Sequence, residues 1–125
     1  SCSDVVDYCI PLFHGVNHEV VYMIGVDDGL KVLQTVKLAE GVVNQVHIPI
    51  RKVMQTALSM GATGVILTHN HPAGVALPSH EDMLTTRSIL DALKMVDVQL
   101  IDHVIVADGE GTSMLDNHRM PQPPR

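Results

Sequence analysis

The apolar run at residues 20–26 constrains the fold more than any other segment of this sequence. A strand with one face in water alternates apolar and polar residues, whereas a nearly unbroken apolar strand is covered on both faces. Asp27-Asp28-Gly29 then signals a turn, and residues 31–39 are expected to return as a strand. The chain is therefore expected to place other elements on both sides of a sheet.

Two segments show the apolar spacing of helices. Pro49 suits a first helical turn, where its missing N–H leaves nothing unpaired, and Gly61 supplies a stop. Between them, apolar residues recur at helical spacing at Ile50, Val53, Met54, Ala57 and Leu58. Ser79 is expected to open a second long helix that runs to about residue 96, and residues 5–12 are expected to form a short one.

The remaining apolar segments predict strands. We expect them at residues 46–48, 63–68 and 98–107, and around residues 113–115 after a turn at residues 108–111. Strands mixed with two good helices favour an α/β fold, a mixed β-sheet flanked by helices, over a barrel.

The composition limits the classes of function. The 125 residues are enough for one domain with its own core, and 46% of them are hydrophobic. Only 2% are aromatic and none is Trp, so the stacking platforms of single-strand binders are nearly absent. The net charge of −6 has the wrong sign for neutralising phosphates. We do not expect this domain to bind nucleic acid directly.

The sequence also predicts the cellular compartment of the protein. It contains only two cysteines, Cys2 and Cys9; a disulfide between them stays open, but such sparse usage fits a reducing compartment at least as well. No signal peptide and no apolar run of membrane-spanning length are evident, so we expect a cytoplasmic protein without a membrane anchor. The chain begins Ser-Cys-Ser and not with Met, and we expect it to be part of a longer protein. The Pro-rich end, residues 117–125, is expected to be a flexible tail.

The chemistry concentrates in Thr68-His69-Asn70-His71-Pro72, which ends the strand at residues 63–68. Alternate strand residues share a face, so His69 and His71 project to the same side. Two imidazoles placed in this way can meet one ion, and a carboxylate would complete a three-ligand zinc site with a fourth position for water.

Asp82 is the candidate carboxylate. The apolar stripe of its helix reads Thr86, Ile89, Leu90, Leu93 and Val96, and four residues before Thr86 lies Asp82. An inward carboxylate without a partner would be unfavourable by several kcal/mol (roughly 2–7), and a metal removes that penalty. The alternative is that Ser79 and Asp82 form a helix cap that also suits the helix dipole. Capping does not exclude metal binding, because a carboxylate has two oxygens.

A hydrolytic zinc site also needs a base. Glu19 lies where the buried strand begins, an unusual place for an acid, whereas Glu40 next to Gly41 is explained by a surface turn. The pattern favours Glu19 over Glu40 only slightly. Glu81 is expected to face outward and to favour the helix dipole.

These residues resemble a known family. Glu19, Thr68-His69-x-His71 and Asp82 with Ser79 three before it are similar to the JAMM motif of MPN+ metalloproteases. The segments His69-Asn70-His71-Pro72-Ala73-Gly74 and Pro78-Ser79-x-x-Asp82 more closely resemble the bacterial RadC proteins, historically labelled DNA repair proteins. Ala73 and Val75-Ala76-Leu77 depart from the RadC pattern in the loop that would line the site.

The resemblance implies a cytidine-deaminase-like MPN/JAMM domain over residues 4–116, with His69, His71 and Asp82 as zinc ligands. It implies Glu19 as the acid and base that handles the zinc water, and Ser79 as a hydrogen-bond donor near the reacting carbonyl. The expected activity is hydrolysis of a peptide or isopeptide bond in an unidentified protein, and a homodimer is compatible with it. His103, beside Asp102, is either a residue that supports the metal ligands or a structural histidine.

One alternative stays open, a zinc-binding or interaction module in DNA repair or recombination that catalyses nothing. Other readings of the motif fail. HNH nucleases spread their residues over a larger unit, amidohydrolases need a barrel of about twice this length, and zinc deaminases need a Pro-Cys-x-x-Cys that is absent here.

Overall fold

The computed structural model describes residues 2–41 and 48–116, which contain a five-stranded mixed sheet in the order β2-β1-β3-β4-β5. β3 and β4 are parallel, and each other pair of neighbours is antiparallel. The predicted α/β class, a mixed sheet flanked by helices, is confirmed. The elements are α1 (Cys2–Cys9), the 3₁₀ helix η1 (Ile10–Phe13), β1 (Glu19–Val26), β2 (Val32–Gly41), α2 (Ile50–Met60), β3 (Gly64–Asn70), α3 (His80–Lys94), β4 (Gln99–Ala107) and β5 (Glu110–Ser113).

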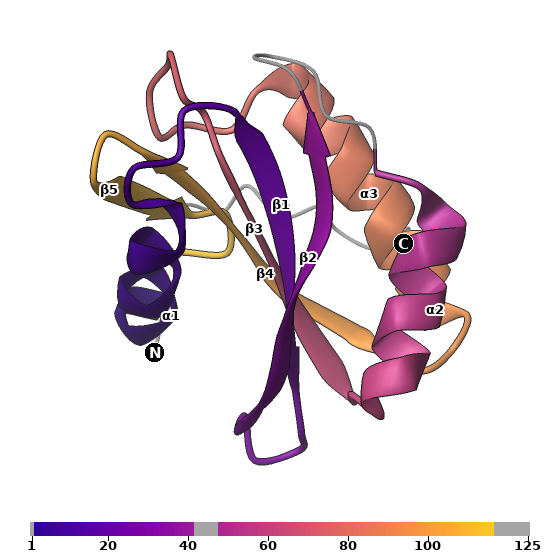
Figure 1. Cartoon of the computed structure of the whole chain (residues 1–125). Coiled ribbons are helices and arrows are strands. Elements are labelled where there is room, and N and C mark those ends of the chain that lie inside the picture. The colour runs from indigo at the N-terminus through magenta and orange to yellow at the C-terminus, as the bar shows by residue number, and fades with distance from the viewer. Residues whose placement is uncertain (1, 42–47, 117–125) are drawn as a thin grey trace.

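Helices cover both faces of the sheet, with α1 on one side and α2 and α3 on the other (Figure 1). β1 contributes to both resulting cores, because Val21 and Met23 pack with the α2 and α3 residues while Val20 and Ile24 pack with Cys9 of α1 and its neighbours. The apolar run at residues 20–26 is therefore buried on both faces, as predicted.

Local sequence signals end and begin the helices. Gly61 adopts a left-handed conformation (φ 65°) after α2, and its N–H donates to the carbonyls of Ala57 and Leu58. At the start of α3, the Ser79 hydroxyl accepts from the Asp82 N–H (3.0 Å) and the Asp82 carboxylate accepts from the Ser79 N–H (2.8 Å). The predicted cap is confirmed.

None of the helices in the described part of the chain has the length and apolar character that crossing a membrane requires.

The end of the sheet differs from the prediction. Asp108 and Gly109 both have positive φ, 52° and 75°, and form a two-residue turn that pairs Ala107 with Glu110. The predicted turn and last strand are both present, but their predicted bounds, 108–111 and 113–115, are wrong, because this shorter turn starts β5 at Glu110 and the strand ends at Ser113. Most of the strand predicted at residues 46–48 lies outside the described residues, as does the tail at 117–125, and Ile48 is not in a strand.

Cys9 is a free, buried thiol, so the disulfide that the sequence left open is not formed by it. Burial raises the pKa of this thiol to about 11, which outweighs a hydrogen bond with Thr68. At neutral pH Cys9 is a protonated core residue and not a nucleophile.

A buried carboxylate fixes the corner where β4 meets the segment after β5. Asp102 is 1% exposed. Its Oδ1 accepts from the backbone N–H groups of His103 (2.7 Å) and Leu115 (3.0 Å), and its Oδ2 accepts from the Ser113 hydroxyl (2.5 Å). Three donors thus compensate the carboxylate for the loss of water.

We expect Asp102→Ala to lower the free energy of unfolding by about 2–4 kcal/mol, because it leaves buried donors without their acceptor. Asp102→Asn should retain part of this stability, since an amide oxygen can still accept. Denaturant unfolding measures both. Asp91→Ala is the matched control, because Asp91 is exposed and pairs only along its own helix with Arg87. Equal effects of Asp102→Ala and Asp91→Ala would contradict the anchoring role.

Candidate metal centre

The histidines of β3 and the first turn of α3 meet at one point. His69, His71 and Asp82 each offer one ligand atom, and these three atoms all lie within 4.8 Å of one another. The two Nε2 atoms are 3.1 Å apart, and Asp82 places Oδ1 3.2 Å from His69 Nε2 and Oδ2 3.0 Å from His71 Nε2. The point lies at the carboxyl end of a parallel strand, where open α/β sheets commonly bind ligands.

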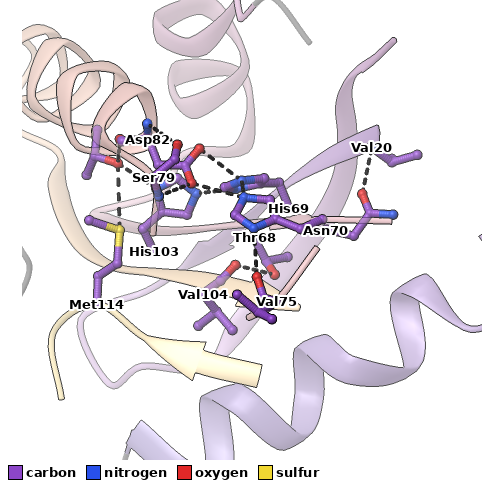
Figure 2. Close-up of polar contacts among 12 residues, drawn as sticks. Val20, Thr68, His69, Asn70, Val75, Ser79, Asp82, His103, Val104 and Met114 are labelled. Carbon is purple, nitrogen blue, oxygen red and sulfur yellow. Dashed lines mark hydrogen bonds and ion pairs between the residues drawn. The ribbon is translucent and has the colours of Figure 1, made fainter. Parts of the chain in front are cut away.

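Strand and helix periodicity bring these side chains together. His69 follows Val65 and Leu67 on the face of β3 that packs against α2 and α3. Asp82 lies one helical turn before the buried Thr86, as the apolar stripe predicted, and its side chain is 16% exposed. Figure 2 shows His69 and Asp82 pointing toward each other from the two elements.

The hydrogen bond behind His71 leaves the nitrogen that faces the cluster without a proton. His71 Nδ1 lies 2.9 Å from the Val75 carbonyl, which can only accept, so a neutral His71 carries its proton on Nδ1. Its Nε2 then presents a lone pair to the Asp82 carboxylate and to His69. Lone pairs at hydrogen-bond distance repel unless a cation lies between them. Two imidazole nitrogens and one carboxylate form a donor set that suits a divalent transition metal.

Charges within the cluster shift the pKa values of its members. Burial alone raises the pKa of Asp82, but hydrogen bonds with His69 and His71 outweigh it, and the net pKa lies well below the ordinary range. The hydrogen bond with Asp82 raises the pKa of His71, against the opposing effect of burial, and the charge of Glu19 adds to the rise. A proton or a metal ion on His71 Nε2 is therefore favoured electrostatically.

Comparison with known proteins shows the family to which the chain belongs. The family model described as a RadC-like JAB domain matches residues 1–120. The chain belongs to this family. The resemblance that the sequence motif indicated is confirmed, and the His69, His71 and Asp82 cluster is compatible with the metal site of a JAB domain.

Curated relatives of this RadC-like JAB domain are bacterial proteins named UPF0758. One from Photobacterium profundum is 40% identical over 103 residues, which cover 82% of this chain and 46% of the relative. One from Azotobacter vinelandii is 42% identical over 99 residues, covering 79% and 44%. One from Pseudomonas syringae pv. syringae is 36% identical over 118 residues, covering 94% and 53%. The chain thus spans about half the length of these relatives, and their names state no activity.

Glu19 is the first residue of β1, the strand that pairs with β3 beside the cluster. Val21 pairs with His69 across the two strands, and the charge of Glu19 contributes to the raised pKa of His71. Asn70 fixes this end of β1: its Oδ1 accepts from the Val20 N–H (2.8 Å) and its Nδ2 donates to the His18 carbonyl (2.9 Å). The Asn70 amide therefore holds the backbone on both sides of Glu19, a role that the sequence analysis missed.

Glu40, the competing candidate base, is engaged at the surface. It contacts His18 Nε2 at 2.8 Å and Lys37 Nζ at 3.7 Å, and the hydrogen bond with His18, followed by the charge of Lys37, lowers its pKa.

Ser79 caps α3 as an acceptor, so its own hydroxyl proton stays available for donation. Glu81 is exposed in the first turn of α3, as expected.

We expect metal affinity to fall as the pH is lowered through the His71 pKa, which lies above its ordinary value of 6.5. Metal and proton compete for the same nitrogen, so the affinity should fall about tenfold per pH unit below that pKa. Asp82 stays ionised over this range and adds no pH dependence. Chelator-competition titrations between about pH 8 and about pH 5.5 measure the effect, and a flat profile would argue against His71 as a ligand.

Proposed function

We propose that this domain is a zinc-dependent metallohydrolase that acts on peptide or isopeptide bonds, with His69, His71 and Asp82 holding the ion. The observation that carries the proposal is the convergence of two imidazole nitrogens and a carboxylate, all within 4.8 Å of one another, with the proton of a neutral His71 held on its far side by the Val75 carbonyl. Zinc accepts such ligands, and a catalytic zinc site typically has three protein ligands and one open position.

Each residue has a chemical role in this proposal. Bound zinc would lower the pKa of a water in the open position and polarise the substrate carbonyl. Glu19, whose charge acts on His71, would take a proton from the attacking water and later deliver it to the leaving amine. Asn70 would hold Glu19 in place through the backbone bonds to residues 18 and 20.

Ser79 would stabilise the charge that develops on the carbonyl oxygen. Its hydroxyl oxygen accepts from the Asp82 N–H, which fixes the side chain next to the proposed ligand and leaves the hydroxyl proton to donate. A donor held in this way needs little reorganisation when the negative charge appears.

The surface around the cluster favours a protein substrate over a nucleic acid. The net charge is −6. Val75 and Leu77, in the loop after His71, are 66% and 59% exposed, and apolar side chains at this position would contact a peptide better than a phosphate backbone.

We expect the purified wild-type protein to hold about one zinc per chain and His71→Ala to hold almost none. His71→Ala removes one imidazole ligand, and the two remaining ligands, His69 and Asp82, cannot replace it. Elemental analysis after gel filtration measures the content, and His14→Ala is the matched control because His14 is exposed and outside the cluster. Equal zinc in wild type and His71→Ala would refute the ligand assignment.

We expect Glu19→Gln to keep its zinc and to lose cleavage by about 10²–10⁴-fold, because glutamine cannot accept the water proton. Cleavage of a peptide and isopeptide library, read by mass spectrometry, tests this. Glu40→Gln should cleave like wild type, since Glu40 is occupied by His18 and Lys37. A zinc-loaded domain that cleaves nothing, or a fully active Glu19→Gln, would favour a non-catalytic module or a different base.

A further inference from the structure

A chain of buried hydrogen bonds lies behind the ligand cluster and connects two of its members. His69 Nδ1 lies 2.7 Å from His103 Nε2, and His103 Nδ1 lies 2.6 Å from the Thr86 hydroxyl. The Thr86 hydroxyl in turn lies 2.6 Å from the backbone carbonyl of Asp82. The three residues that form this hydrogen-bond chain are nearly inaccessible to water: His69 is 4% exposed, His103 1% and Thr86 0%.

The carbonyl at one end sets the direction of every bond in this chain. The Asp82 carbonyl and Met114 Sδ, 3.9 Å from the Thr86 hydroxyl, can only accept, so the single proton of this hydroxyl points to one of them and not to His103. Thr86 must then accept from His103, which places the proton of His103 on Nδ1. A neutral His103 has a bare Nε2, which accepts from His69, and this places the proton of His69 on Nδ1.

Building on the metal site proposed above, we propose that His103 and Thr86 are positioning residues that fix the tautomer of His69 and so aim its Nε2 lone pair at the metal. Without the chain, His69 could carry its proton on Nε2 and would then present a donor where the ion needs a lone pair. The chain also ties the Asp82 backbone to the His69 ring, so the two ligands hold a fixed separation.

Each ring nitrogen of His103 has a partner within the protein. His69 lies at Nε2 and Thr86 at Nδ1, and His103 is 1% exposed. The neighbouring Asp102 carboxylate accepts from the His103 backbone N–H and from Ser113, and no bond joins it to the His103 ring. A purely structural histidine needs only satisfied hydrogen bonds. The His103 ring, in addition, connects the proposed ligand His69 on one side to the Thr86 hydroxyl on the other.

The tautomers can be measured directly in the metal-free wild-type protein. Long-range ¹H–¹⁵N spectra of the histidine rings should show His103 and His69 each protonated on Nδ1. Because this measurement needs neither zinc nor substrate, it decides the direction of the chain even if the protein proves to have no hydrolase activity. A proton on Nε2 of either ring would overturn the proposal.

A matched pair of variants tests the effect on the metal. Thr86→Val keeps the shape and removes the hydroxyl, and we expect it to weaken zinc binding by about 10–100-fold in chelator competition. Thr86→Ser keeps the hydroxyl and should bind within about threefold of wild type. The same spectra should show His69 of Thr86→Val as a mixture of tautomers.

Ile89→Val controls for loosened packing. Ile89 is fully buried on the same helix and belongs to the apolar core, so shortening it should lower stability and leave zinc affinity unchanged. If Thr86→Val binds zinc as tightly as wild type, or if Ile89→Val weakens binding to the same extent, His103 and Thr86 are structural residues only.

Discussion

The contact of the Asp82 carboxylate with two imidazoles is the interaction on which the rest of the site depends. The same carboxylate accepts from the Ser79 N–H and so starts α3, while its two oxygens reach His69 and His71 at the end of β3. Helix capping and ligand geometry are therefore set by one side chain. Because Asp82 lies in the first turn of α3, and α3 packs on β4 through Thr86 and His103, any displacement of this helix start would move the proposed ligand and the groups behind it together.

The sequence was sufficient to predict those features that depend on local rules of strand and helix geometry. Alternation along a strand places His69 and His71 on one face, and the helical period places Asp82 in line with Thr86. The Ser79 cap and the Gly61 stop follow from backbone groups within a few residues of each other. These features need no knowledge of the strand order, which explains why the cluster was predictable although the topology was not.

The sequence left the role of His103 open, because the face on which its side chain lies depends on a break in strand alternation. Leu100 pairs with Val65 and Asp102 with Ile66, so Ile101 is an extra residue in β4. Leu100 packs in the core beneath α2 and α3, and strict alternation would turn His103 to the opposite face. The irregularity at Ile101 returns His103 to the side of α3, where it meets Thr86. Asn70 was missed for a related reason, since its partners at residues 18 and 20 are distant in sequence.

The balance of donors and acceptors distinguishes the ligand cluster from the other buried polar groups around it. Thr68 donates to the Val104 carbonyl, Asn70 offers one donor and one acceptor to complementary backbone groups, and Asp102 receives three donors. The hydrogen bonds of each of these groups are made within the protein, so a structural role in the fold accounts for them. At the cluster, by contrast, the Val75 carbonyl uses the proton of a neutral His71 elsewhere, and the proposed tautomer of His69 does the same, so that acceptors face acceptors. Such an arrangement opposes folding unless a positive charge completes it, which is the physical reason to regard the cluster as a binding site and not as a structural network.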